Sequence, residues 1–285
     1  MDKGDSLRVI GRKLNDKGII ENEVVFEFFA RLFELDREIQ SGEYHISNSQ
    51  SIREILAELS SGAVIRNKIT IPEGKTSIQV VKILNELASL VGKITVLPPE
   101  GSIAPDTYFF SNGQSRTILL DQMQKAQKSI LKRIWQKRSR NLSLKSSDEL
   151  LILASIIEKE TGKYSERAVI SSVLHNRLKK GMRLQADPTV IYGITQGKKS
   201  LGRKLLRSDL KKFSKHNTYM INGLPETPIC NPGKDSLLAA ANPSETNFLF
   251  YVANGKGGHA FSQTLEQHNK NVRIWREIIK DLGAD

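Results

Sequence analysis

Apolar residues near the start of the chain recur at helical spacing. The pattern predicts three helices, over residues 7–14, 24–35 and 52–59. Ser51 is placed to cap the start of the third helix, and Gly62 is placed to end it. Between the second and third helices, polar and apolar residues alternate over 42–46, which predicts a short strand. This part of the chain is therefore expected to mix helix and strand.

Further along the chain, both patterns continue and the helices become longer. Alternation predicts strands over 64–71 and 94–97. Helices are predicted over 78–87, 118–137, 150–161 and 236–241. A hairpin is expected where residues 248–253 precede the glycine-rich loop 255–258. The helix over 150–161 is the most apolar of the chain, and the whole pattern predicts an α+β fold.

The composition is that of an ordinary globular protein. Of the 285 residues, 39% are apolar and 26% are charged, so neither disorder nor a fibrous fold is expected. No run approaches the roughly 18 uninterrupted apolar residues of a membrane span, and the first residues are polar, unlike a signal peptide. The single cysteine, Cys230, excludes an internal disulfide and a cysteine-based metal site. The sequence therefore predicts a soluble chain.

Positive charge is concentrated beyond the first part of the chain. There are 43 basic and 31 acidic residues, a net charge of +12. Residues 1–65 hold 8 basic and 12 acidic residues, so the remainder is strongly basic. Two runs, 124–145 and 196–215, hold eight basic residues each. Such runs fit either an anionic polymer (nucleic acid, membrane surface or acidic glycan) or only a solvated helix face.

The helix over 150–161 places two glutamates on opposite sides. At about 100° per residue, Glu160 shares the apolar stripe of the helix, whereas Glu158 lies about 160° away. A carboxyl group on an apolar stripe must be paired, protonated or at the rim of a cleft, because burying an isolated carboxylate is costly. Desolvation would raise its pKa toward the range that a general acid needs near neutral pH. The alternative is that Glu160 reaches solvent or pairs with Arg167 or Arg177.

Several later segments are dense in hydrogen-bonding side chains between proline and glycine turns. They cover residues 181–192, 217–219, 223–225, 231–233 and 255–261. Side-chain amides and carboxylates bind sugar hydroxyls, and aromatic faces stack on pyranose rings. Each segment alone is a weak signal, because 231–233 is also typical of a simple turn and 255–258 of a hairpin loop.

Together these segments resemble a known family. The run Ala154-Ser-Ile-Ile-Glu-Lys-Glu-Thr161 is followed by Glu166-Arg167, Asn176-Arg177-Leu178, Met182-Arg-Leu-Gln-Ala-Asp-Pro-Thr-Val-Ile-Tyr192, Asn217-Thr-Tyr219, Gly223-Leu-Pro225, Asn231-Pro-Gly233 and Gly257-Gly-His259. In this order they resemble the endolytic murein transglycosylase (YceG-like) family, lytic transglycosylases of peptidoglycan. A weaker match extends upstream through Ile71-Pro-Glu-Gly74 and Pro105-Asp-Thr-Tyr108.

The resemblance implies two domains within the α+β class. Residues 1–66 would form a small LysM-like α/β module, cut short at its start, and residues 67–285 a larger mixed α+β catalytic domain, with 67–110 as its linking segment. Family members have an amino-terminal membrane anchor that this chain lacks, which we interpret as truncation. A location on the inner membrane, facing the periplasm, is implied by the resemblance alone.

The family's reaction cleaves the MurNAc–GlcNAc glycosidic bond without water and leaves a 1,6-anhydroMurNAc end, in cell wall assembly. By matching Glu160-Thr161 to the Glu-Ser pair of other lytic transglycosylases, the resemblance assigns Glu160 as acid and then base. The residues do not decide between endolytic and exolytic cleavage, although the family favours the former. The residues expected to position the sugar or stabilise positive charge, or else only to stabilise loops, are Gln185, Asp187, Tyr192, Asn217, Tyr219 and His259.

The partners implied by the resemblance are peptidoglycan glycan strands and cell wall synthases of the elongation machinery. No cofactor is expected, and no metal, because the five histidines are scattered without ligand spacing. One alternative is a non-catalytic peptidoglycan-binding protein in which Glu160 has no role. A nucleic-acid binder is disfavoured, because aromatic residues make up only 6% of the chain and scarcely interleave with the basic runs.

Overall fold

The computed structural model describes residue 1, residues 4–62 and residues 67–281. The described chain divides into two compact units, each with its own core. The first comprises Met1–Ile69, Leu87–Gly92 and Thr107–Arg116, and the second comprises Thr70–Glu86, Lys93–Asp106 and Thr117–Asp285. The domain boundary predicted at residue 66 lies outside the described residues.

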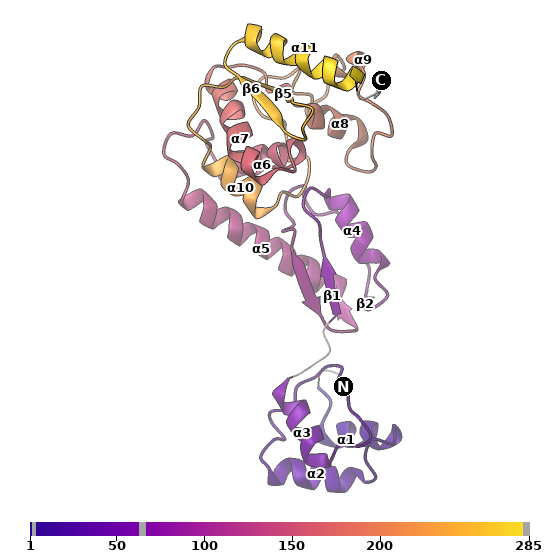
Figure 1. The fold of residues 1–285 in the computed structure, drawn as a ribbon. Coiled ribbons are helices and arrows are strands. Elements are labelled where there is room, and N and C mark those ends of the chain that lie inside the picture. Colours follow the sequence, from indigo (N-terminus) through magenta and orange to yellow (C-terminus); the bar gives the residue numbers. More distant parts are fainter. Residues whose placement is uncertain (2–3, 63–66, 282–285) are drawn as a thin grey trace. The chain divides into compact units, whose positions relative to one another are not determined.

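The first unit begins with a group of three helices (Figure 1). They are α1 (Leu7–Asp16), α2 (Glu23–Leu32) and α3 (Ile52–Ser61). The side chains of Ser6, Asn22 and Ser51 cap their amino ends, and Ser51 forms a capping box with Glu54. Gly62 ends α3 with a φ of 70°, a conformation that favours glycine. All three predicted helices are confirmed, although α2 ends three residues earlier than predicted.

The strand predicted over 42–46 is wrong. Gly42 and Met1 exchange a single reciprocal pair of backbone hydrogen bonds, both 3.0 Å. The Tyr44 hydroxyl donates to the carbonyl oxygens of Gln40 and Leu59. A strand needs a continuous ladder with a neighbour, and alternation of side chains does not supply one. The segment is therefore irregular, and these hydrogen bonds hold its backbone.

Short strands complete the first unit. β1 (Asn67–Thr70) pairs with β3 (Thr107–Phe110), and β2 (Leu90–Val91) runs parallel to β4 (Gln114–Ser115). The strand predicted over 64–71 begins outside the described residues and is confirmed as β1. The strand predicted over 94–97 is wrong, because both the N–H and the carbonyl of Ile94 are bound by the side chain of Asn85.

The second unit is mainly helical. Its helices are α4 (Ser77–Glu86), α5 (Arg116–Gln136), α6 (Ser147–Glu160), α7 (Tyr164–Lys179), α8 (Asp187–Thr195), α9 (Arg207–Leu210), α10 (Lys234–Ala241) and α11 (Leu265–Asp281). The four helices predicted in this region are confirmed as α4, α5, α6 and α10. With the strands of both units, they confirm the α+β class.

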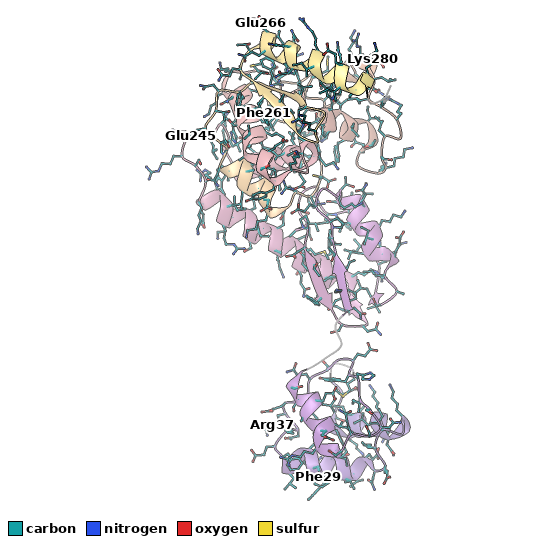
Figure 2. The ribbon with its side chains drawn as sticks, viewed as in Figure 1. Phe29, Arg37, Glu245, Phe261, Glu266 and Lys280 are labelled. Carbon is teal, nitrogen blue, oxygen red and sulfur yellow. The ribbon has the colours of Figure 1, made fainter. Side chains whose placement is uncertain are left out.

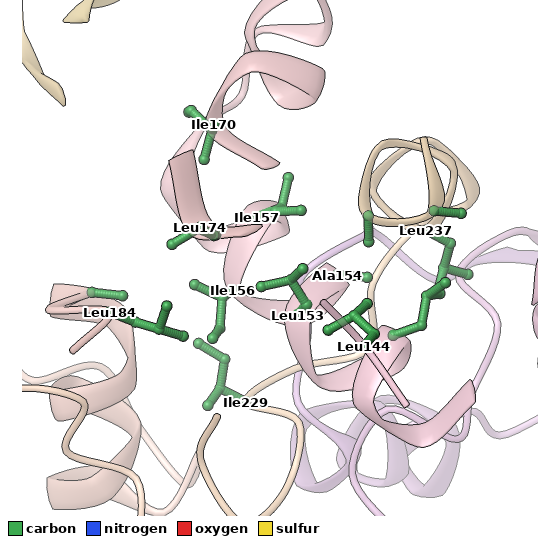
Figure 3. Close-up of a cluster of buried hydrophobic side chains, with 14 of the residues drawn as sticks. Leu144, Leu153, Ala154, Ile156, Ile157, Ile170, Leu174, Leu184, Ile229 and Leu237 are labelled. Atoms are coloured by element: carbon green, nitrogen blue, oxygen red, sulfur yellow. The ribbon is translucent and has the colours of Figure 1, made fainter. Parts of the chain in front are cut away.

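The core of the second unit is built around α6, which packs against α7 and α10. Figure 3 shows Leu153, Ile156 and Ile157 of α6 facing Ile170 and Leu174 of α7. All five side chains are fully buried. Burying an aliphatic side chain of this size contributes about 1.5 to 3 kcal/mol, so these side chains anchor α6 in the core.

A hairpin lies against this helical core. β5 (Phe250–Ala253) pairs antiparallel with β6 (His259–Ser262), with Tyr251 opposite Phe261. The predicted hairpin is confirmed. Helix α11 packs on its outer side (Figure 1), and Figure 2 marks the ends of that helix by Glu266 and Lys280.

Within residues 4–62 and 67–281, no helix combines the length and the apolar character that a membrane crossing requires. The same residues contain no cluster of three or more His, Cys, Asp or Glu side chains arranged to hold a metal ion.

Candidate functional site

The candidate site lies at the carboxyl end of α6. Ser146 caps the start of this helix, and Thr161, with extended backbone, ends it directly after Glu160. Other residues of the same stripe are fully buried, namely Leu153, Ile156 and Ile157. Glu160 itself is half-buried. The apolar stripe therefore leaves the core at the end of the helix, and Glu160 stands at its rim, where the helical phase predicted it.

The surroundings of Glu160 favour its protonated form. Burial raises the pKa of Glu160 to about 7, and the negative charge of Asp187 adds to the rise. A hydrogen bond with Tyr251 and the positive charge of Arg177 act in the opposite direction. Burial disfavours the ionised form of a carboxyl group because it removes solvating water. Near neutral pH, Glu160 is therefore poised between carboxylic acid and carboxylate.

Arg177 of α7 acts on Glu160 through its charge, while its Nε and Nη1 bind other groups. Its Nε donates to the carbonyl oxygen of Leu249 at 2.6 Å, and its Nη1 donates to that of Leu184 at 2.7 Å. Its guanidinium also lies over the ring of Phe250, 5.3 Å from the centroid. The described ion pairs do not join Arg177 to Glu160, so the pairing offered as an alternative is not formed.

Two of the predicted site residues interact with Glu160, and a third contacts Arg177. Asp187 opens α8 and accepts a hydrogen bond from the Tyr219 hydroxyl at 2.6 Å. Burial and this bond raise the pKa of Tyr219 well above its usual value, and the charge of Glu160 contributes to the rise. Gln185 has a φ of 52°, uncommon for a non-glycine residue. Its Oε1 accepts from Nη1 of Arg177 at 3.4 Å.

Asn217 and Tyr192 do not belong to this group. Asn217 is 1% exposed. Its amide donates to carbonyl oxygens within residues 209–212, at 2.7 Å in the shortest case, and its Oδ1 accepts the N–H of Tyr219 at 2.9 Å. Asn217 thus stabilises the loop that carries Tyr219. Tyr192 donates its hydroxyl proton to Glu100 at 3.0 Å and lies farther along α8.

His259 is the sixth predicted residue, and it contacts Tyr251 and not Glu160 itself. Its Nδ1 is 2.7 Å from Glu166 Oε2, and its backbone N–H donates to the other oxygen of that carboxylate at 3.0 Å. Although burial acts in the opposite direction, these bonds hold the pKa of Glu166 below its usual value. The imidazole meets the Tyr251 ring edge-on, 5.4 Å between centroids. His259 therefore packs against the tyrosine that binds Glu160.

Sequence reasoning missed Tyr251. It lies in the middle of β5, where it is half-buried, and burial and the charge of Glu160 raise its pKa well above the usual value. The hairpin prediction placed it on a strand, but a single tyrosine among Phe250, Val252 and Ala253 carries no sign of a polar partner. Only the approach of its side chain to Glu160 in the folded chain reveals its role.

The second glutamate of α6 has a different environment. Glu158 accepts the N–H of Gly233 at 3.0 Å and lies 3.5 Å from the guanidinium of Arg167. The same guanidinium pairs with Glu73 at 3.3 Å and Asp235 at 3.5 Å. We call this group the Arg167 cluster. It ties the end of α6 to the start of α10, and it takes up the arginine that the sequence offered as a partner for Glu160.

This arrangement has the chemistry of a single acid and base. One carboxyl group of pKa about 7 can donate a proton and later accept one. The second carboxylate nearby, Asp187, is bound by a tyrosine hydroxyl. Its negative charge, like the tyrosine hydroxyls, is suited to stabilising positive charge that develops on a bound substrate.

Comparison with known proteins gives one family. The model of the YceG-like family matches residues 1–274. A curated relative from Bacillus subtilis (strain 168), an endolytic murein transglycosylase, is 30% identical over 94% of this chain and 81% of its own length. The endolytic murein transglycosylase of Streptococcus pneumoniae (strain D39) is 26% identical over 95% of this chain, which spans about half, 56%, of that relative.

A solved structure is also similar. The crystal structure of a YceG-like protein from Listeria monocytogenes matches with a TM-score of 0.56 and 31% sequence identity. The match covers 95% of this chain and 97% of the other. Sequence and fold therefore agree over nearly the whole chain.

Proposed function

The chain belongs to the YceG-like family, and from this we propose that it is a peptidoglycan lytic transglycosylase. Relatives that bear the name endolytic murein transglycosylase match nearly its full length, at 26% and 30% identity. The reaction cleaves the MurNAc–GlcNAc bond and leaves a 1,6-anhydroMurNAc end. The observation that carries the proposal is the half-buried Glu160, whose pKa burial raises to about 7.

In this mechanism Glu160 acts twice. As a carboxylic acid it donates its proton to the glycosidic oxygen, and the C1–O bond breaks as the GlcNAc-side hydroxyl leaves. The resulting carboxylate then accepts the proton of the C6 hydroxyl, whose oxygen bonds to C1 of the same MurNAc. Glu160 ends protonated, as it began, so that no water is consumed and no second carboxylate is required as nucleophile. A pKa near neutrality suits both steps.

We further propose that Asp187, Tyr219 and Gln185 act around the reacting sugar. Positive charge develops at C1 as the bond breaks. The Asp187 carboxylate would stabilise that charge, and the Tyr219 hydroxyl holds the carboxylate in place at 2.6 Å. Gln185 presents an amide that can bind sugar hydroxyls. Tyr251 forms a hydrogen bond with the Glu160 carboxyl, and the imidazole of His259 packs edge-on against the Tyr251 ring.

Three finer expectations remain predictions. They are that residues 1–66 form a LysM-like module, that cleavage is endolytic, and that the protein works on the inner membrane, facing the periplasm, with synthases of the elongation machinery. The helices α1 to α3 form a compact group with their own core, which is compatible with a separate binding module.

The experiment that tests the proposed function is product analysis by mass spectrometry after digestion of purified peptidoglycan in oxygen-labelled water. A lytic transglycosylase releases fragments that end in 1,6-anhydroMurNAc and carry no label. A hydrolase would release reducing ends that carry the label. Binding to peptidoglycan without released fragments would instead identify a non-catalytic binding protein.

A further inference from the structure

A basic pocket lies beside the candidate site in the second unit. It has a volume of about 480 Å³, within the range of about 300–1,000 Å³ that small-molecule sites occupy. Residues of five segments line it: the start of α4 with the turn that leads into it, the end of α6, one side of α8, the loop over 197–203, and Ile229. Its cationic side chains are Lys159, Lys199 and Arg203, and none of its lining residues, all of them described, is acidic.

The pocket shares its walls with the elements that hold the candidate acid. Lys159 directly precedes Glu160 on α6. On α8, Pro188 lines the pocket and directly follows Asp187, whose charge acts on Glu160. The pocket and Glu160 therefore share the end of α6 and the start of α8, so that a polymer bound at Glu160 has the pocket within reach of its neighbouring groups.

Of the three cationic side chains of the pocket, one is bound to a described carboxylate and two are not. Arg203 binds Asp209 through two hydrogen bonds, at 2.6 and 3.0 Å, and these bonds lower the pKa of Asp209 to about 2. Lys159 and Lys199 are exposed, and no ion pair joins either of them to a described carboxylate. Two unpaired ammonium groups at one pocket attract an anionic ligand.

The other walls are apolar or neutral. They include Ile191 and Tyr192 of α8, Gln79 of α4, and Thr76, which directly precedes α4. This mixture suits a ligand that carries a carboxylate next to small apolar groups and amide groups. The stem peptides of peptidoglycan have this chemistry: they are short, contain alanine, are attached to the lactoyl group of MurNAc and carry free carboxylates.

We propose that this pocket binds a stem peptide of the glycan strand, through its carboxylate, while the neighbouring glycosidic bond lies at Glu160. The inference rests on the proposed transglycosylase function. It makes the enzyme selective for strands that still carry peptides over strands from which peptides have been removed. Lys199 supplies the charge from the exposed loop, Lys159 supplies it from α6, and Tyr192 forms part of the apolar wall.

The test compares two substrates with one variant pair. Lys199→Glu reverses a charge inside the pocket, whereas Lys198→Glu makes the same change at the adjacent exposed residue, which does not line it. Each is assayed on peptide-bearing and on peptide-free glycan strands. For Lys199→Glu we expect KM on peptide-bearing strands to rise about tenfold, the effect of about 1.4 kcal/mol in binding, with peptide-free strands and kcat unchanged. Lys198→Glu should change neither.

Two results would overturn the pocket proposal: an equal loss on both substrates, or no change in KM on the peptide-bearing one. If Lys198→Glu raised KM equally, the effect would come from general surface charge and not from the pocket, and the proposal would be overturned as well. Failure of the wild-type chain to cleave either substrate would refute the proposed function instead. In that case calorimetry on the same variants still tests the pocket proposal. It predicts that Lys199→Glu weakens binding of peptide-bearing strands and leaves binding of peptide-free strands unchanged.

Discussion

The two glutamates near the end of α6 are two residues apart and have opposite surroundings. Glu158 is bound by a backbone N–H and by Arg167, which also holds two other carboxylates. Glu160 meets a tyrosine, an aspartate and apolar packing, and its pKa rises to about 7. One helix therefore carries a structural carboxylate on one side and a proton-transfer group on the other. Residue type does not distinguish the two roles, but the partners do.

The largest effect on stability is expected when the Arg167 cluster is broken. Arg167→Met leaves Glu158, whose side chain is 6% exposed, without its cation. Removing one partner of a buried pair costs about 3 kcal/mol, so the urea midpoint at pH 7 should fall while the position of the pH–rate profile stays unchanged. A matched control is Arg203→Met, which breaks the more exposed pair with Asp209 and should lower the midpoint much less, because exposed ion pairs contribute little to stability. Equal falls of the urea midpoint in the two variants would show that the Arg167 cluster contributes no more to stability than an exposed ion pair does.

The Glu160 side of the helix should show the reverse behaviour, in which removal of the acid stabilises the fold. Its folded pKa is about 7 against an ordinary value of 4.5. Below pH 4.5 the group is protonated in both states and contributes nothing. As pH rises from 4.5 to 7, the unfolded chain ionises more readily, and the folded state loses stability. Glu160→Gln should therefore be about 3 kcal/mol more stable than wild type at pH 8 and equal at pH 4, by denaturant unfolding, because each unit of pKa shift corresponds to about 1.4 kcal/mol. A variant that is less stable at both pH values would contradict the raised pKa.

Asp187 provides a sharper test of what sets that pKa. Its negative charge raises the pKa of Glu160, so Asp187→Asn should lower it. The alkaline limb of the pH dependence of kcat/KM should then move to lower pH, and activity at pH 8 should fall about tenfold for a shift of about one unit. A limb that does not move would show that Asp187 acts on the substrate alone.

The smallest effect is expected at Tyr251. Its hydrogen bond favours the carboxylate of Glu160, so Tyr251→Phe should raise the pKa and move the same limb to higher pH. Losing one such bond changes the rate only severalfold. The two variants thus shift one profile in opposite directions, and shifts of the same sign would refute the electrostatic account of the site.

Only part of the second unit could be predicted from the sequence. Apolar spacing predicted α4, α5, α6 and α10, the glycine-rich loop predicted the hairpin, and the phase of α6 separated Glu160 from Glu158. Helices α7, α8, α9 and α11 were not predicted. The strands predicted over 42–46 and 94–97 are wrong, because side-chain bonds from Tyr44 and Asn85 organise the backbone there. Local patterns do not reveal such partners.

The candidate site was predicted in part for a similar reason. Gln185, Asp187 and Tyr219 lie near Glu160, in segments that resemble the family. Asn217, from the same segments, is buried and holds a loop. Tyr251 was missed because its role depends on the approach of its side chain to Glu160, a contact between residues far apart in sequence. Residue types indicate which segments form a site, whereas tertiary packing determines which of their side chains come together.

The most direct test of the central claim is the rate at which 1,6-anhydroMurNAc ends form from purified peptidoglycan with Glu160→Gln. The matched control is Asp148→Asn, the same change of carboxylate to amide at an exposed position in the first turn of α6. Because general acid–base catalysis contributes about 10²–10⁴-fold, we expect Glu160→Gln to lose about a thousandfold in rate while it remains folded. Asp148→Asn should retain wild-type activity. Substantial anhydro-end formation by Glu160→Gln would contradict the assignment of Glu160 as the acid and base.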